Sequence, residues 1–153
     1  MNKRDTKFVS RIIVLSMTAL AFSIAARIAL ESDELTKLFP RNAAREFMIF
    51  FAPLVSLMAL HYTLAVKSFG MRSLKTEGMI FVFCASIFLA VTLAYFLGVK
   101  VEIPPEGCPW WRLRGCEGTL VHRDNYLWSA LIALVGLGAL LFSLKREGLL
   151  TKA

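Results

Sequence analysis

The most informative absence in this sequence is that of acidic residues from its long apolar stretches. No Asp or Glu lies within residues 8–30, 47–66, 78–99 or 126–144. Proton-driven pumps and cation transporters ordinarily need a buried carboxylate to move charge, so this absence argues against an autonomous transporter. Only 19% of the chain is charged, and the charges cluster instead of spreading as they do over a soluble protein.

Signatures of catalysis and cofactor binding are also missing. The chain has no glycine-rich phosphate loop, no His-Glu-x-x-His zinc motif, no serine elbow and no Cys-x-x-Cys pair. No buried acid–base pair points to hydrolysis, and the segments between the apolar stretches are too short to form enzyme domains. The sequence therefore favours a non-enzymatic protein and predicts no cofactor and no metal, with bound lipid as the one expected small molecule.

The four apolar stretches dominate what is present. Hydrophobic residues make up 57% of the 153 residues, and the mean hydropathy is +0.61. Each stretch is near the roughly 20 residues that cross a bilayer as a helix, and lipid leaves the backbone no other partner for its polar groups. The sequence thus predicts an all-α membrane protein, a four-transmembrane-helix bundle forming a single domain over residues 1–153.

The distribution of basic residues predicts the orientation of this bundle. Residues 1–11, 67–77 and 145–153 carry ten basic and three acidic residues, so they hold the whole formal net charge of +7. Cytoplasmic segments of membrane proteins carry an excess of Lys and Arg. We therefore predict a multi-pass protein of the plasma membrane with cytoplasmic N- and C-termini and with outer loops at residues 31–46 and 100–125.

The first span and the net charge can each be interpreted in a second way. The apolar run at residues 8–30 is longer than that of a cleaved signal peptide, so we expect an uncleaved signal-anchor. A net positive charge is also typical of proteins that bind nucleic acid. However, no stripe of basic residues interleaved with aromatic residues lies outside the spans. The expected partners are therefore other integral membrane subunits and membrane lipids, and not nucleic acid.

The outer segment at residues 104–118 is rich in Pro and Gly, which excludes a regular helix there. It holds Cys108 and Cys116 with seven residues between them, on the side predicted to be oxidising. We predict a structural disulfide bond, which closes such a loop with a gain of about 2–3 kcal/mol. A redox-active pair and a metal site with His122 are the alternatives.

Four residues between these cysteines are candidate contacts with a partner: Trp110, Trp111, Arg112 and Arg114. Paired tryptophans beside a span commonly anchor a protein at the depth of the lipid headgroups. Trp and Arg are also the residues that contribute most to protein–protein interfaces. The two interpretations are compatible, and both stay open.

Polar residues inside a span are functional candidates by default, and this chain has few. Arg11 and Arg27 lie near opposite ends of the first span, where each side chain is expected to reach the headgroups. Arg27 also lies one helical turn before Glu31. His61 with Tyr62 is a candidate quinone or ion site, or His61 forms a hydrogen bond between helices.

Small residues predict where the helices contact one another or a partner. The third span has four of them at four-residue spacing: Ser86, Ala90, Ala94 and Gly98. The first span has Ala21, Ala25 and Ala29 at the same spacing. Helices associate in lipid through close packing, so small residues mark the contact faces.

Three functional hypotheses follow. The leading hypothesis is a non-catalytic accessory or scaffold subunit of a larger membrane complex, with partner contacts through the small-residue helix faces and the outer loop. The first alternative is a membrane thiol–disulfide redox protein that uses Cys108 and Cys116. The second alternative is a small lipid or substrate carrier lined by His61, Tyr62 and Pro53.

Overall fold

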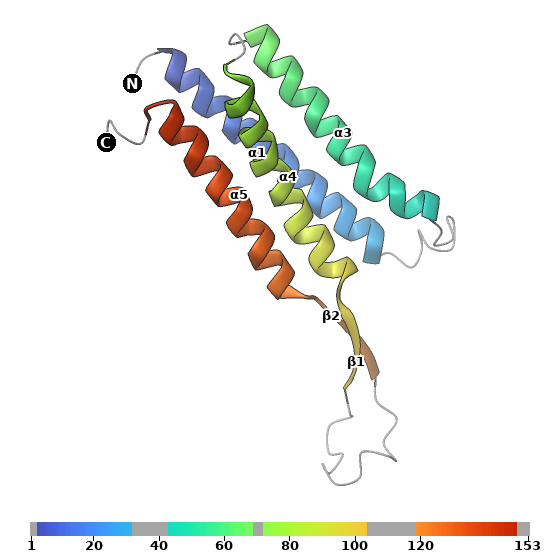
Figure 1. Ribbon diagram of the computed structural model, residues 1–153. Coiled ribbons are helices and arrows are strands. Elements are labelled where there is room, and N and C mark those ends of the chain that lie inside the picture. Colours follow the sequence, from blue (N-terminus) through green and yellow to red (C-terminus); the bar gives the residue numbers. More distant parts are fainter. Residues whose placement is uncertain (1–2, 32–42, 69–71, 104–118, 150–153) are drawn as a thin grey trace.

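The computed structural model describes residues 3–31, 43–68, 72–103 and 119–149. Its helices are α1 (Lys3–Glu31), α3 (Ala43–Ser68), α4 (Leu74–Phe96) and α5 (Tyr126–Arg146), which run side by side as a bundle (Figure 1). Each of the four helices is long and apolar enough to cross a membrane. The prediction of a bundle of four helices that are long and apolar enough to span a membrane is therefore confirmed.

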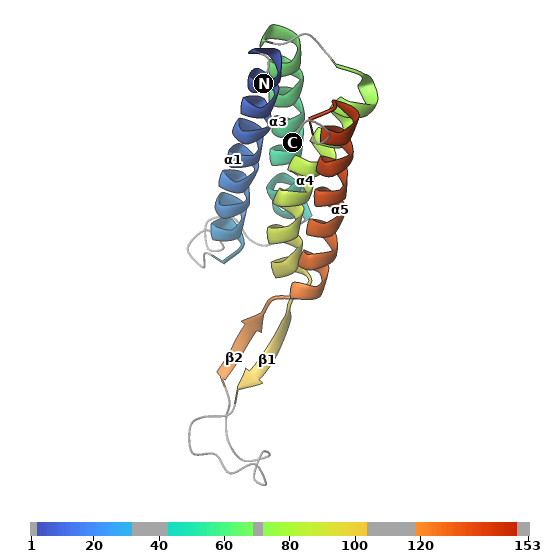
Figure 2. The same cartoon turned by 90° about the vertical axis from the view of Figure 1, so that its left-hand side faces the viewer.

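The bundle has two distinct ends (Figure 1). At the termini end, α1 begins, α5 ends and the chain passes from α3 to α4. At the hairpin end, a two-stranded β-hairpin continues from α4 and α5 (Figure 2). Among the described helix pairs, α4 packs most extensively against α5 and next against α1, whereas α3 packs less closely against α1 and α4.

The α1–α4 interface forms the apolar core. Phe8, Ile12, Leu15 and Ala19 repeat at three- and four-residue spacing along α1 and are buried, as are three residues of α4 at strict four-residue spacing: Ile80, Cys84 and Phe88. Side chains at these spacings share one face of a helix. Lipid tails are as apolar as these side chains, so this contact is stabilised by close packing and by polar contacts more than by removal from water.

Helix α4 begins four residues before the predicted span at residues 78–99. Ser73 caps the helix, and its Oγ accepts a hydrogen bond from the Thr76 backbone N–H at 3.3 Å. The cap satisfies one of the free N–H groups of the first turn. It brings Glu77 into the helix with only 5% of its surface exposed. The prediction that no span carries a carboxylate is therefore wrong, because it placed the start of the helix at the first apolar residue.

The β-hairpin was not predicted. Strands β1 (Val99–Ile103) and β2 (Thr119–Arg123) are antiparallel, with Val99 opposite Arg123 and Ile103 opposite Thr119. Residues 100–125 were predicted to form one outer loop. The missed signal is the alternation of β-branched and charged residues in Val-Lys-Val-Glu-Ile, which is typical of a strand.

Several predictions concern residues outside the described part of the chain. The proposed Cys108–Cys116 disulfide and the candidate contacts Trp110, Trp111, Arg112 and Arg114 lie within residues 104–118. Most of the outer loop at residues 31–46 also lies outside. These predictions stay predictions.

Candidate functional site

Charged and polar residues from all four helices or their immediate flanks, with one phenylalanine between them, meet at the termini end of the bundle. We call this group the termini cluster. Its members are Asp5, Phe8, Arg11, His61, Arg72, Glu77 and Glu147. Three come from α1 and one from α3, Arg72 and Glu77 come from the start of α4 and its approach, and Glu147 follows α5 directly.

Arg11 and Glu77 form the centre of the termini cluster. Nη2 of Arg11 donates to both carboxylate oxygens of Glu77, at 2.9 Å to Oε1 and 2.8 Å to Oε2. The two side chains are only 1% and 6% exposed. The prediction that Arg11 extends to the headgroups is therefore wrong, because a carboxylate on the neighbouring helix offers its guanidinium a closer partner inside the bundle.

His61 approaches the same carboxylate from α3. Its Nε2 lies 3.1 Å from Oε2 of Glu77. This is a close contact, but neither ring nitrogen of His61 meets the geometry of a hydrogen bond with any of the described residues. The residue is nonetheless 91% buried, with an exposed fraction of 9%. Glu77 thus joins α4 to both α1 and α3, and His61 keeps hydrogen-bonding capacity within the bundle.

Arg72 extends the termini cluster to both ends of the chain. Its guanidinium pairs with Glu147 and lies 3.6 Å from Asp5 Oδ1, while its backbone N–H donates to Glu77 Oε1 at 3.2 Å. The Phe8 ring lies beside two cations, 4.2 Å from Cζ of Arg72 and 5.5 Å from Cζ of Arg11. Cation–π contacts of this kind strengthen when water is excluded.

This arrangement has a large energetic consequence. Removing one partner of a buried ion pair typically costs about 3–5 kcal/mol, because it leaves the other charge buried without compensation. Arg11 and Glu77 compensate each other, and each becomes costly if the other is removed. The termini cluster therefore makes the relative positions of α1, α3 and α4 interdependent.

A cavity of about 330 Å³ adjoins His61. Its lining residues are Met58, His61, Tyr62 and Ala65 on α3, and Leu74, Glu77, Gly78 and Phe81 on α4. On each helix these four residues follow the spacing i, i+3, i+4, i+7, which is one helical face. We call this space the His61 cavity. The cavity thus includes the predicted candidates His61 and Tyr62, and also Glu77, which was predicted to lie in a loop.

Arg27 organises a second polar group at the hairpin end. It pairs with Glu31, as the spacing predicted, and its Nη1 lies 2.7 Å from Asp124 Oδ2 at the approach to α5. Its Cζ lies 4.4 Å from the centre of the Tyr95 ring. The Arg27 side chain is 28% exposed, so this group is far more open to its surroundings than the Arg11–Glu77 pair.

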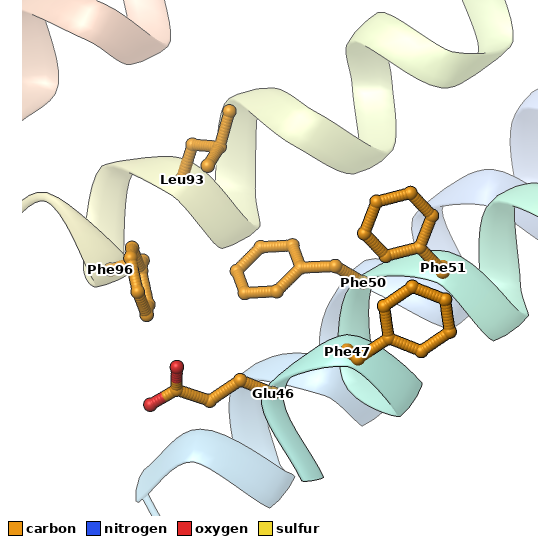
Figure 3. Close-up of a pocket in the computed structure, with 6 residues that line it drawn as sticks. All are labelled: Glu46, Phe47, Phe50, Phe51, Leu93 and Phe96. Carbon is orange, nitrogen blue, oxygen red and sulfur yellow. The ribbon is translucent and has the colours of Figure 1, made fainter. Parts of the chain in front are cut away.

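An aromatic groove separates α3 from α4 near the hairpin end (Figure 3). Phe50 extends from α3 toward α4, where its ring meets Phe96 edge to face at 5.4 Å (Figure 3). Phe47 and Phe51 stack on one another along α3 at 4.3 Å. The cavity here is also about 330 Å³. Its lining is apolar except for Glu46, so it offers surface for packing and little chemistry.

The small residues of the third span lie at a contact within the chain. Ser86, Ala90 and Ala94 are buried, and Gly98 is partly exposed. A Cβ added to Gly136 of α5 would lie 1.7 Å from Ser86 Oγ, so α4 and α5 cross very closely at this point. Most of this face is therefore already covered by the protein itself.

The rest of the described chain adds no catalytic constellation to these sites. Pro53 lies within α3 and does not line the His61 cavity. Among the residues that the structure describes, no three His, Cys, Asp or Glu side chains are grouped as metal ligands. Comparisons with protein-family models, with curated proteins and with solved structures find no match for this chain.

Proposed function

We propose that this protein is a non-catalytic accessory or scaffold subunit of a larger integral-membrane complex. The observation that carries the proposal is the β1–β2 hairpin, which extends beyond the helix ends and away from the bundle (Figures 1 and 2). Ile103 and Thr119 pair at the far end of this hairpin, so residues 104–118 are attached there. The hairpin is thus the part of the described chain that reaches farthest from the bundle, which is where we expect a partner to be contacted.

The composition of this segment supports a protein contact. Trp110, Trp111, Arg112 and Arg114 belong to the residue types that dominate interface energies. We further propose that Cys108 and Cys116 form a disulfide bond within it. The strand pairing already brings the two ends of the segment together, which lowers the entropic cost of closing a loop between them.

We also propose that the protein resides in the plasma membrane with both termini in the cytoplasm. Helix α1 begins and helix α5 ends at the same end of the bundle, as an even number of spans requires (Figure 1). The positive charge excess is on this side. Tyr126 and Trp128, both exposed in the first turn of α5, fit an aromatic belt at the opposite interface.

Within the membrane, the proposed partner surface is the outward face of α3 and the aromatic groove beside it. This assignment replaces the small-residue face of α4, because α5 occupies it at Ser86. Helix α3 is the helix that packs least extensively on the rest of the bundle. Phe47 and Phe51 are more than half exposed on it, so a partner helix could bury their rings.

The direct test is affinity purification of the full chain from native membranes in a mild detergent. We expect other integral membrane subunits to co-purify in fixed stoichiometry, and Trp110→Ala with Trp111→Ala to lose them. Trp128→Ala, at the same end of the protein but outside the hairpin segment, is the matched control and keeps the partners. A monomer that never co-purifies with a partner contradicts the proposal.

A further inference from the structure

The aromatic groove between α3 and α4 holds no reactive group, but it has the size of a ligand site. Its cavity of about 330 Å³ is within the range of small-molecule pockets, roughly 300–1,000 Å³. Glu46 is the one charged residue in its lining. In Figure 3 the Glu46 carboxylate and the Phe96 ring lie on the same side of the groove, and the Phe50 ring extends toward them. One carboxylate and two rings therefore border a shared space.

Glu46 has no counter-ion among the described residues. It takes part in none of the ion pairs that they form. Glu46 lies in the first turn of α3, where the helix dipole stabilises a negative charge. The helix end thus tolerates this charge without a basic neighbour, and the carboxylate is available to a cation from outside the chain.

Two other places in the protein combine an aromatic ring with carboxylates, and each of them contains an arginine. In the termini cluster, Cζ of Arg72 lies 4.2 Å from the centre of the Phe8 ring, and its guanidinium pairs with Glu147. At the hairpin end, Cζ of Arg27 lies 4.4 Å from the centre of the Tyr95 ring, and its guanidinium pairs with two carboxylates. The aromatic groove has the rings and the carboxylate, but no described cation lies over its rings. A cation from outside would complete it as arginine completes the other two.

The lining of the groove selects among cations. Calcium takes about six to eight oxygen ligands, and the groove has a single carboxylate. A primary ammonium has three N–H donors to satisfy, and Glu46 is the one side-chain acceptor in the lining. A quaternary ammonium has no donors, and aromatic rings bind it through their faces. The groove therefore favours a quaternary ammonium ion.

The groove is open sideways to the surrounding lipid. Phe47, Phe51 and Phe96 are 56%, 51% and 46% exposed, so a ligand can reach their rings from the bilayer. Helix α3 begins and α4 ends at the hairpin end, so Phe51 and Leu93 lie deeper in the bundle than Glu46 and Phe96 (Figure 1). An alkyl tail attached to the cation can therefore run along Phe51 and Leu93 toward the middle of the membrane.

We propose that the aromatic groove binds a quaternary ammonium ion that carries an alkyl tail and no phosphate, with its head between Glu46 and Phe96. The choline headgroup of a phospholipid has the same ammonium group. However, its phosphate would bring a second negative charge near Glu46, and no basic side chain is among the lining residues to compensate for it. The proposal does not rest on the accessory-subunit role, and the chain alone suffices to test it.

The test uses two probes with the same tail and different head charge. Dodecyltrimethylammonium is a cation, whereas dodecyldimethylamine oxide carries no net charge in neutral buffer. Binding of each radiolabelled probe to the purified full chain in phosphatidylcholine nanodiscs is measured by equilibrium dialysis, and partition into empty nanodiscs is subtracted. We expect the cation to bind saturably and about tenfold more tightly than the amine oxide, from the combined attraction of the carboxylate and the rings.

Two variants of the groove separate these contributions. Glu46→Gln removes the charge and keeps the size of the side chain, and Phe96→Leu removes a π face and keeps an apolar residue. Each should lower the preference for the cation by about two- to fivefold. The matched controls are Glu31→Gln, at the same end of the bundle, and Phe142→Leu, whose ring is 49% exposed on α5. Neither residue lines the groove, so both controls should keep the preference.

The outcomes decide the proposal in either direction. It is supported if both groove variants lower the preference and both controls keep it. It is overturned if the cation does not bind saturably in the presence of excess choline headgroups, or if the two probes bind equally. A preference that survives in Glu46→Gln and Phe96→Leu, or that Glu31→Gln lowers as much as Glu46→Gln does, also overturns it. Circular dichroism and the elution volume of each variant establish that it is folded.

Discussion

The two ends of the bundle use the same ionic chemistry in opposite surroundings. At the termini end, Arg11 and Glu77 are 1% and 6% exposed, whereas at the hairpin end Arg27 and Glu31 are 28% and 49% exposed. Water and headgroups can replace a lost partner for Arg27, but little can do so for Arg11. The comparison teaches that burial, and not the number of ion pairs, decides which end the bundle depends on.

Removing the charge of Glu77 should produce the largest effect. Glu77→Gln leaves the Arg11 guanidinium buried without a counter-ion, so we expect a loss of about 3–5 kcal/mol in the free energy of unfolding. The measurement is titration with a denaturing detergent, followed by helical circular dichroism in mixed micelles. A loss below that of an ordinary surface substitution would show that the termini cluster is open to water.

Gly136→Ala should have the next largest effect. The added Cβ meets Ser86 Oγ at 1.7 Å and Ser86 Cβ at 2.7 Å, so rotation of the serine hydroxyl alone cannot relieve the clash. We expect a loss of about 1–3 kcal/mol in the same titration. Gly138→Ala is the control, since nothing lies within 4 Å of its Cβ, and Ser86→Gly in the Gly136→Ala background should restore stability. Equal stability of the two alanine variants would refute the close crossing.

Ser73→Ala should have a moderate effect that also bears on the termini cluster. It removes the cap that holds the first turn of α4, at a cost of about 1 kcal/mol. Ser73→Asp provides a different acceptor at the same position and should retain most of the stability. If Ser73→Ala changes nothing, the early start of α4, and with it the placement of Glu77, does not depend on this cap.

Glu31→Gln should have the smallest effect. Arg27 keeps Asp124, the Tyr95 ring and the surrounding water as partners, so we expect a loss of only about 0.2–1 kcal/mol. Measured beside Glu77→Gln, this variant completes the comparison of the two ends. Similar losses at both ends would contradict the role given to burial.

Much of the fold could be predicted from composition alone. The length and apolarity of four stretches determine four spanning helices, because lipid leaves their backbones no alternative. The hairpin was missed because a short strand beside a Pro- and Gly-rich segment carries a weak signal. Its alternation from Val99 to Ile103 was nevertheless present in the sequence.

The site was less predictable than the fold. Hydropathy placed Glu77 in a loop and Arg11 at the headgroups. With both residues assigned outside the bundle, neither was expected to pair with the other. Two signals could have indicated that Arg11 and Glu77 pair. One is Ser73 as an N-cap, and the other is the position of both residues on the same predicted side of the membrane. The small residues of α4 were predicted to form a contact face, and Gly136 of α5 lies very close to one of them, Ser86. Sequence spacing cannot tell such a neighbour in the same chain from a partner.

The central claim is that Arg11 and Glu77 stabilise the bundle as a buried pair. A double-mutant cycle with Arg11→Met, Glu77→Met and the combined variant measures this directly in the unfolding titration. We predict that the combined variant is far more stable than the sum of the two single losses implies, with a coupling of at least about 2 kcal/mol. Additive losses would contradict the claim.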